Sequence, residues 1–203
     1  MTDVYFGLGA NVGDAITTLT AAVYALDDIS EVAVFDVSSV YLTEAWPPAD
    51  DPRHVRQDPF RNCVVVAETS RDPHELLHET QLIEAAFGRD RSREQRWGPR
   101  PLDIDLLLYG DRLIDTPELT VPHPRISQRA FVLVPLLEIA PGLMLPSGLK
   151  ATTAIARLAP ITDVTHEMRL ADVPSRAIPR PLGPDGGQAR FSAGGRDDHS
   201  GRR

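Results

Sequence analysis

The sequence predicts an α+β fold, namely a ferredoxin-like βαββαβ sandwich with additional C-terminal helices. Short apolar runs rich in β-branched residues alternate with segments in which apolar residues recur every three or four positions. The order of these segments is strand–helix–strand followed by strand–helix–strand, as in a split βαβ arrangement. Two further helical patterns follow the second unit and predict the additional helices.

The first unit begins with an apolar run at residues 4–8, which predicts a strand. A helix is expected over about 14–26, because apolar residues recur there at helical spacing: Ile16, Leu19, Val23 and Leu26. Alternating valines over residues 32–41 predict the second strand. The polar, proline-rich stretch that follows has no periodicity and predicts a long loop ending near Pro59.

The second unit consists of a strand over 62–68, a helix begun by Asp72-Pro73 and ended by Gly88, and a strand over 102–109. Further helices are expected over 131–139 and 152–158. We expect residues 1–165 to form the folded domain. Residues 171–203 are rich in Pro, Gly and Arg, and are expected to form a disordered tail because they contain few large apolar residues.

Composition limits the class of protein. The 203 residues carry a formal net charge of -8, which argues against a general nucleic-acid partner. The longest apolar runs are too short to span a bilayer, so no membrane partner is expected. The single Cys63 excludes an internal disulfide, and the N-terminus lacks the pattern of a signal peptide. A cytoplasmic monomer is therefore expected.

Asp103 and Asp105 lie two residues apart on the last predicted strand, so their side chains should project from the same face. The opposite, core-facing side is expected to carry the intervening apolar residues Leu102, Ile104, Leu106 and Leu108. Adjacent carboxylates repel each other unless a cation lies between them, and oxygen ligands favour Mg²⁺. An isolated pair of this kind is more often a solvated strand face, but the nearby Arg100 favours the metal.

An arginine-rich stretch precedes this strand and reads GRDRSREQRWGPR. Five guanidinium groups next to a carboxylate pair suit phosphoryl transfer, in which cations neutralise charge on phosphate: Arg89, Arg91, Arg93, Arg96 and Arg100. Trp97 could cover a ligand from this loop. The alternative is a solvated loop whose arginines are balanced by Asp90 and Glu94.

Three other features carry weaker signals. Gln81 and Glu84 lie three apart on one helix face, where polar residues are common. His123 lies in a proline-containing loop and is more simply read as a surface residue. The glycines between Gly7 and Gly13 match neither the dinucleotide-binding nor the Walker A pattern, and predict only a tight turn.

Six segments together closely resemble the 6-hydroxymethyl-7,8-dihydropterin pyrophosphokinase family. They are GLGANVGD, SSVYLT, Phe60-Arg-Asn62, QLIEAAFGRDR, RWGPRPLDIDLLLYG and LTVPHPRISQRAFVLVPLLEIAP. The resemblance runs from about residue 3 to residue 160, and RWGPRPLDIDLLLYG is highly specific for the family. It implies a ferredoxin-like fold and transfer of diphosphate from ATP to the pterin hydroxymethyl group, with release of AMP.

The resemblance also implies roles for individual residues. Asp103 and Asp105 would hold two Mg²⁺ ions, and with Arg89 and Arg100 they would form the catalytic group. The ATP site would comprise Gln81, Glu84, Arg89, Arg91, Trp97, Arg100, His123 and Arg129. Trp97 would lie on a mobile loop that closes over the substrates.

For the second substrate, the resemblance implies that the ring of 6-hydroxymethyl-7,8-dihydropterin stacks between Phe60 and Phe131, while Asn62 and Thr43 bind its polar edge. The chain departs from the family pattern at Ala10 and Ser92. It also departs in Glu44-Ala45-Trp46 and in a longer loop over 47–59.

Two alternatives remain open from the residues alone. A non-catalytic ferredoxin-like binding module would use the basic loop to contact RNA or protein, and would tolerate loss of the Asp103/Asp105 pair. A metal-dependent phosphotransferase with a non-pterin acceptor would keep the pair but would not need the aromatic residues.

Overall fold

The computed structural model describes residues 1–45, 51–171 and 173–174. Trp46 and residues 47–50 of the predicted loop lie outside the described residues, as does nearly all of the predicted tail. The expectation of a disordered tail over 171–203 therefore stays a prediction.

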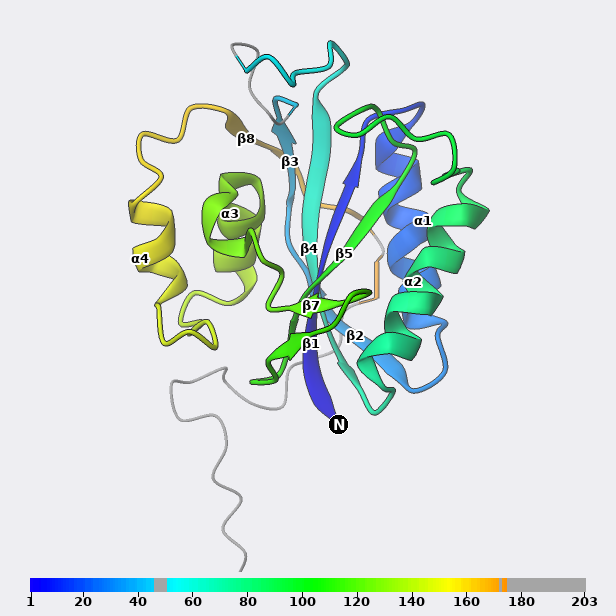
Figure 1. Ribbon diagram of the computed structural model, residues 1–203, viewed down its shortest axis with the longest axis vertical. Coiled ribbons are helices and arrows are strands. Elements are labelled where there is room, and N and C mark those ends of the chain that lie inside the picture. Colours follow the sequence, from blue (N-terminus) through cyan, green and yellow to red (C-terminus); the bar gives the residue numbers. More distant parts are fainter. Residues whose placement is uncertain (46–50, 172, 175–203) are drawn as a thin grey trace, which may run out of the picture.

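Six strands form one sheet through the middle of the molecule (Figure 1). They are β1 (Thr2–Ala10), β2 (Val32–Val37), β3 (Val40–Thr43), β4 (Phe60–Thr69), β5 (Asp103–Tyr109) and β8 (Val164–Met168). The order across the sheet is β5-β1-β4-β3-β8, and β2 also pairs with β4. Each of these pairings is antiparallel.

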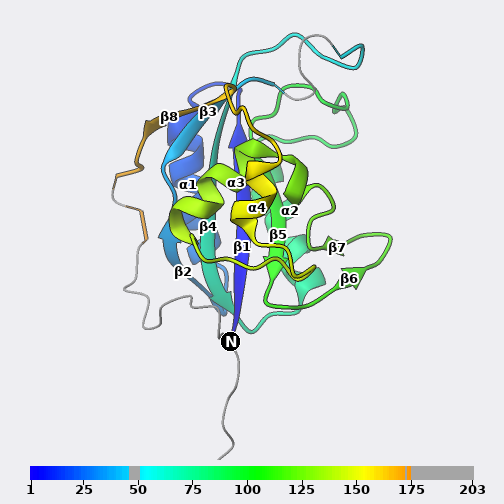
Figure 2. The same ribbon diagram turned by 90° about the vertical axis from the view of Figure 1, so that its left-hand side faces the viewer.

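Helices cover both faces of this sheet. Helices α1 (Ala15–Asp27) and α2 (Pro73–Ala86) lie on one face, while α3 (Ala130–Ile139) and α4 (Ala151–Ala156) lie on the other (Figures 1 and 2). Each of the four predicted helices is present within a few residues of its expected bounds. The predicted α+β class is confirmed.

Local capping explains where the first two helices begin. The Asp14 carboxylate accepts the backbone N–H of Thr17 at 3.1 Å, and the Asp72 carboxylate accepts that of His74 at 2.9 Å. These side chains satisfy N–H groups that have no partner within the helix. Pro73 suits the first helical position because its missing N–H costs no hydrogen bond there. Both starts are therefore encoded locally.

The predicted second strand, 32–41, is interrupted and appears as β2 and β3. At the break, the N–H of Ser38 donates to the carbonyl of Val64 at 2.9 Å, and the N–H of Val64 donates to the Ser38 hydroxyl at 2.9 Å. The Ser38 hydroxyl thus replaces a backbone carbonyl as the acceptor for a β4 N–H at this point of the sheet. Glu138 of α3 accepts the N–H of Ser39 and its hydroxyl, which ties the break to the helix above it.

Strand β5 does not alternate regularly, and the expectation that Leu108 shares a face with Ile104 and Leu106 is wrong. Leu106 packs into the core under α1 and α2, whereas Leu107 and Leu108 both pack into the core under α3 and α4. The pairing register with β1 shifts between Tyr5 and Phe6, so an extra residue of β5 is accommodated there. The alternation holds on the N-terminal side of this bulge, where the aspartates lie.

The sequence patterns did not indicate several short elements: β6 (Ile114–Asp115), β7 (Thr120–Val121), the 3-10 helix η1 (Ile126–Gln128) and β8. Strand β8 is mostly exposed and lacks an apolar alternation, yet it continues the sheet beyond residue 165 by pairing with β3. Within the described residues, no helix is both long and apolar enough to cross a membrane.

Candidate active site

A pocket lies at the end of the sheet where β1 ends and β5 begins. The pocket has an empty volume of about 710 Å³, which includes the space at its open mouth. The walls come from β1, the ends of β3 and β4, the arginine-rich loop, the start of β5, and α3. Its lining includes Gly7, Gly9, Thr43, Phe60, Asn62, Trp97, Arg100, Asp103, Asp105, Arg129 and Phe131. Sheet pairing thus brings together predicted residues that are far apart in the chain.

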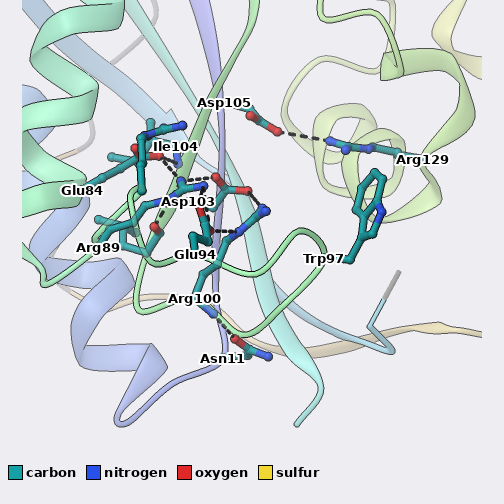
Figure 3. A network of polar contacts seen from close by, with 12 residues as sticks. Asn11, Glu84, Arg89, Glu94, Trp97, Arg100, Asp103, Ile104, Asp105 and Arg129 are labelled. Atoms are coloured by element: carbon teal, nitrogen blue, oxygen red, sulfur yellow. Dashed lines mark hydrogen bonds and ion pairs between the residues drawn. The ribbon is translucent and has the colours of Figure 1, made fainter. Parts of the chain in front are cut away.

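Both aspartates of the predicted pair line this pocket, but different partners hold them (Figure 3). Asp103 Oδ1 accepts a hydrogen bond from Arg89, and its Oδ2 accepts one from Arg100 Nη1 at 2.8 Å. Asp105 Oδ2 accepts one from Arg129 Nη1 at 3.2 Å. The pair therefore lies between a first group of arginines, Arg89 and Arg100, and Arg129 on the other side.

These surroundings shift the two carboxyl pKa values in opposite directions. Burial alone would raise the pKa of Asp103, but the charges of Arg100 and Arg89 and their hydrogen bonds outweigh it and lower this pKa. For Asp105, burial and the neighbouring Asp103 charge raise the pKa to about 6, against the weaker opposing effect of Arg129. Of the two carboxylates, Asp105 is consequently the one whose ionised form a nearby cation would stabilise more.

Arg89 is the buried centre of the first group, with 5% of its side chain exposed. Its guanidinium donates to Glu84 Oε1 at 2.5 Å, to both Glu94 carboxylate oxygens at 3.1 Å, and to Asp103. Burial would lower the pKa of Arg89, but the charges of Asp103 and Glu84 outweigh it and raise this pKa. Arg89 therefore stays charged and rigidly placed.

Glu84 lies beneath the arginines. Only 1% of its side chain is exposed, and it accepts hydrogen bonds from Arg89, Arg91 and the backbone N–H of Ile104, the last at 2.8 Å. Its position links α2 to the arginine-rich loop and to β5 (Figure 3). Of the residues that were predicted to bind ATP, Trp97, Arg100 and Arg129 line the pocket, whereas Gln81, Glu84, Arg89, Arg91 and His123 are not among its lining residues. Arg89, Glu84 and Arg91 form ion pairs that lead to Asp103, and His123 lies near Asp105.

Three polar residues that the sequence analysis did not select organise the loops around the pocket. Glu94 accepts hydrogen bonds from Arg89 and Arg100. Asn11 accepts the Arg100 N–H at 2.8 Å and donates to Gln57 Oε1 at 2.9 Å. Gln57 in turn donates to the Trp97 carbonyl at 2.6 Å. Asn11 lies within a segment that resembles the family, but no sequence pattern indicated Gln57.

Backbone hydrogen bonding places His123 beside the site. Its N–H donates to the Leu107 carbonyl of β5 at 2.9 Å, and the Arg125 N–H donates to its Nδ1 at 3.1 Å. Burial, followed by the charges of Arg129 and Arg125, lowers the His123 pKa to about 4. The imidazole is thus neutral at pH 7, with its proton on Nε2. That atom lies 3.7 Å from Asp105 Oδ2.

The four residues predicted for the flat ring all line the pocket. Phe60 and Phe131 line it, and the Asn62 amide donates to the Thr43 hydroxyl at 2.7 Å within the wall. Gly9 is necessary for this arrangement, because a Cβ there would lie 2.7 Å from Asn62 Oδ1. The glycine pattern predicts only a turn here, whereas Gly9 lies in β1 against the site.

The donor set of the two aspartates fits Mg²⁺. Carboxylate oxygens from one or two side chains, completed by water and by substrate phosphates, are the usual protein ligands of this ion. Asp103 and Asp105 supply such oxygens at the pocket wall. The raised pKa of Asp105 adds a further reason, because a nearby cation would offset both causes of it, the burial of the carboxylate and the charge of Asp103.

The family described as 7,8-dihydro-6-hydroxymethylpterin-pyrophosphokinase (HPPK) matches residues 5–141. A Pseudomonas aeruginosa protein named 2-amino-4-hydroxy-6-hydroxymethyldihydropteridine pyrophosphokinase is 42% identical over 145 residues, covering 71% of this chain and 85% of its own. A protein of that name from Methylorubrum extorquens is 42% identical over 160 residues, with 79% and 96% covered. One from Bacillus subtilis is 46% identical over 135 residues, with 66% and 76% covered.

Solved structures of proteins named HPPK-DHPS have a similar fold. A crystal structure of HPPK-DHPS in complex with substrates has a TM-score of 0.57 and 12% identity, covering 77% of this chain and 43% of that chain. Wild-type Plasmodium falciparum HPPK-DHPS has a TM-score of 0.58 and 13% identity, with 77% and 44% covered. This chain spans less than half of those chains, and at these identities the likeness concerns the fold alone. From the family match and the curated relatives, the chain is a member of the 7,8-dihydro-6-hydroxymethylpterin-pyrophosphokinase family.

Proposed function

We infer that the chain transfers diphosphate from ATP to the hydroxymethyl group of 6-hydroxymethyl-7,8-dihydropterin, with AMP as the second product, in folate biosynthesis. The observation that carries this is the composition of one pocket. Its lining combines Phe60, Phe131 and the Asn62 amide with two carboxylates and with Arg100 and Arg129, and the Arg129 guanidinium lies 5.4 Å from the Phe131 ring centroid. The pocket can therefore hold a flat heterocycle next to a metal-bound polyphosphate. Relatives that match most of this chain carry the name of this pyrophosphokinase.

In the proposed complex, Phe60 and Phe131 fix the plane of the pterin ring by stacking. Asn62 and Thr43 recognise its polar edge, and the hydrogen bond between them orients the Asn62 amide beforehand. A ring held in this way would have its hydroxymethyl group within the pocket that Asp103 and Asp105 also line.

At the phosphate site, Asp103 and Asp105 would hold Mg²⁺, and two ions are proposed. When bound, Mg²⁺ would neutralise charge on the phosphate oxygens. Arg100 and Arg129 contact the phosphates directly from the pocket wall. Arg89 and Arg91 lie behind them, anchored by Glu84.

The transfer itself depends on placement and charge rather than on a strong base. Neutral His123 can donate a hydrogen bond from Nε2 to a substrate oxygen near Asp105. The lowered pKa of His123 makes its imidazole a weak proton acceptor at pH 7. In-line attack of the pterin hydroxyl on the β-phosphorus then requires mainly that the two substrates be held in contact. Trp97 and its loop would shield this contact from water.

Further aspects of the proposal concern the molecule as a whole. The order of β5, β1, β4 and the β2/β3 strand, with two helices on one face, supports a ferredoxin-like arrangement. The pyrophosphokinase domain would extend beyond the expected bound of residue 165, because β8 runs to Met168 and Leu170 is buried in the core, with 171–203 as an appendage. We also propose that the chain acts in the cytoplasm as a monomer.

A metal-dependent phosphotransferase with a non-pterin acceptor is the second candidate. It shares the carboxylate pair and the arginines, but it leaves the two phenylalanines and the Gly9-dependent position of Asn62 without a role. The non-catalytic module is disfavoured by Asp105, because a carboxylate with a raised pKa is costly to keep in a surface that only binds a partner.

AMP release from Mg-ATP, measured with and without 6-hydroxymethyl-7,8-dihydropterin, tests the proposal. We expect AMP formation that depends on the pterin. ADP as the product would retain the phosphate site but contradict diphosphate transfer. A folded protein that turns over no nucleotide would contradict the enzyme assignment and favour the binding module.

A further inference from the structure

Arg125 lies on the loop between β7 and η1, and none of the roles above uses its side chain. Its backbone is fixed, because the N–H of Gln128 donates to its carbonyl at 3.0 Å and its own N–H donates to His123. The loop is in turn attached to β5 through His123 and Leu107. Arg125 therefore projects from a rigid support.

The guanidinium of Arg125 stacks on the indole of Trp97. Its central carbon lies 4.7 Å from the ring centroid, and the corresponding carbon of Arg96 lies at 5.1 Å. Cations at this distance are attracted to the electron-rich face of an indole. Arg96 belongs to the same loop as Trp97, whereas Arg125 reaches the ring from another part of the fold.

Trp97 needs external support. Its φ of 68° lies in the left-handed region, which is unfavourable for a residue with a large side chain. Such a conformation persists when the surrounding structure holds it. Gln57 holds the Trp97 carbonyl at 2.6 Å, and Arg125 contacts the ring.

This contact joins two segments that both supply residues to the proposed phosphate site. The loop over 89–100 carries Arg89 and Arg100, whereas the segment that follows β7 carries His123 and Arg129. Figure 3 shows Trp97 on the same side of the site as Arg129, with Arg89 and Glu84 on the other side. A contact at Trp97 thus affects how Arg89 and Arg100 are placed relative to Arg129.

The local charges make the link responsive to an anion. Arg125 lies among other cations: burial, and then the charges of Arg129, Arg96 and Arg53, lower its pKa. These like charges repel one another, and Arg129 among them lines the pocket. A polyphosphate between them would reduce the repulsion, and the Arg125–Trp97 contact would then hold the loop more firmly.

We propose that Arg125 is a positioning residue that holds the 89–100 loop, through the face of Trp97, against the segment bearing His123 and Arg129, and so favours Mg-ATP binding. The proposal rests on the proposed function for the identity of its ligand. The contact itself is independent of turnover and can be measured without it.

The test uses the full chain carrying Trp46→Phe, which leaves Trp97 as the sole tryptophan of the two in the sequence. In this background, Arg125→Ala should shift Trp97 emission to the red and lower its anisotropy before any ligand is added. The dissociation constant for Mg-ATP, followed by the same signal, should rise about two- to fivefold, as expected for loss of one partly exposed cation–π contact. Arg125→Lys should give an intermediate effect, because an ammonium lacks the planar stacking surface.

Arg112→Ala is the matched control, since Arg112 makes the same kind of contact with Tyr109, 5.6 Å from its ring centroid, away from the pocket. It should change neither signal. If Arg125→Ala does not fold, Arg125→Gln replaces it, because glutamine removes the charge and keeps a polar side chain. Unchanged Trp97 emission and Mg-ATP affinity in the folded variant would overturn the proposal. A wild-type chain without pterin-dependent AMP release would instead contradict the proposed function, while the fluorescence comparison would still decide about Arg125.

Discussion

The side-chain amide of Gln57 donates to the backbone carbonyl of Trp97 at 2.6 Å, across 40 residues of sequence. Its oxygen accepts from Asn11, whose own oxygen accepts the N–H of Arg100. One glutamine therefore connects three segments around the pocket mouth: the end of β1, the loop before β4, and the arginine-rich loop.

Replacing Gln57 by alanine should loosen the arginine-rich loop. Three side-chain hydrogen bonds are lost, and two of them reach other segments. Each contributes about 0.5–1.5 kcal/mol, so kcat/KM for Mg-ATP should fall about tenfold or more. Steady-state kinetics with saturating pterin would measure this. Gln128→Ala is the control, because Gln128 is exposed. Equal kinetics for the two variants would exclude a role for Gln57 in holding the loop.

Removing the charge of Asp105 should abolish transfer while preserving the fold. Asp105→Asn loses a proposed metal ligand, and we expect AMP release to fall by about 10²–10³-fold or more, as for other charge-stabilising groups at active sites. The circular dichroism spectrum should match that of the wild type. A variant that retains most of its turnover would remove Asp105 from the metal site.

The same substitution should stabilise the metal-free protein at neutral pH. The folded-state pKa of Asp105 is raised to about 6, above the value of about 4 in an unfolded chain, so folding takes up a proton between these pH values. The ionised carboxylate therefore opposes folding above pH 6, and this cost disappears below about pH 4.

We expect Asp105→Asn to raise the free energy of unfolding by on the order of 1 kcal/mol at pH 7.5. This is less than the full pKa shift would give, because 34% of the side chain is exposed to water. Urea titrations in EDTA at pH 7.5 and pH 4 would show whether the difference vanishes at the lower pH. A difference that grows toward low pH would contradict the assigned sign.

Gly9→Ala should damage the pterin end of the site selectively. The new methyl group would lie 2.7 Å from Asn62 Oδ1, so the amide must move and lose its hydrogen bond to Thr43. KM for the pterin should rise about tenfold, as expected for a buried polar group left without its partner, while KM for ATP changes little. Gly7→Ala is the comparison, because there the methyl group meets only the flexible Leu107 side chain, at 3.3 Å.

Deleting residues 177–203 should leave turnover and the melting temperature unchanged. The prediction rests on composition, since this part of the sequence is rich in Pro, Gly and Arg and contains few large apolar residues. Steady-state kinetics of the truncated chain against the full chain would measure it. A large loss of turnover would show that the tail takes part in catalysis.

Local patterns predicted most of the secondary structure and part of the site. Alternation placed Asp103 and Asp105 on one face of β5, and both line the pocket. The same rule failed three residues later at Leu108, because the bulge depends on the pairing of β5 with β1. Strand β8 escaped notice because its side chains are mostly exposed, and its existence depends on pairing with β3.

The sequence by itself therefore determined the order of strands and helices, the carboxylate pair and the arginine-rich loop, because each depends on the spacing of neighbouring residues. Only the tertiary structure decided that Glu84 is buried beneath Arg89, that Gln57 binds Trp97, and that burial and the charge of Asp103 raise the pKa of Asp105. These relationships arise between segments that meet through sheet pairing and loop packing, and the energy of a buried charge depends on all the groups around it.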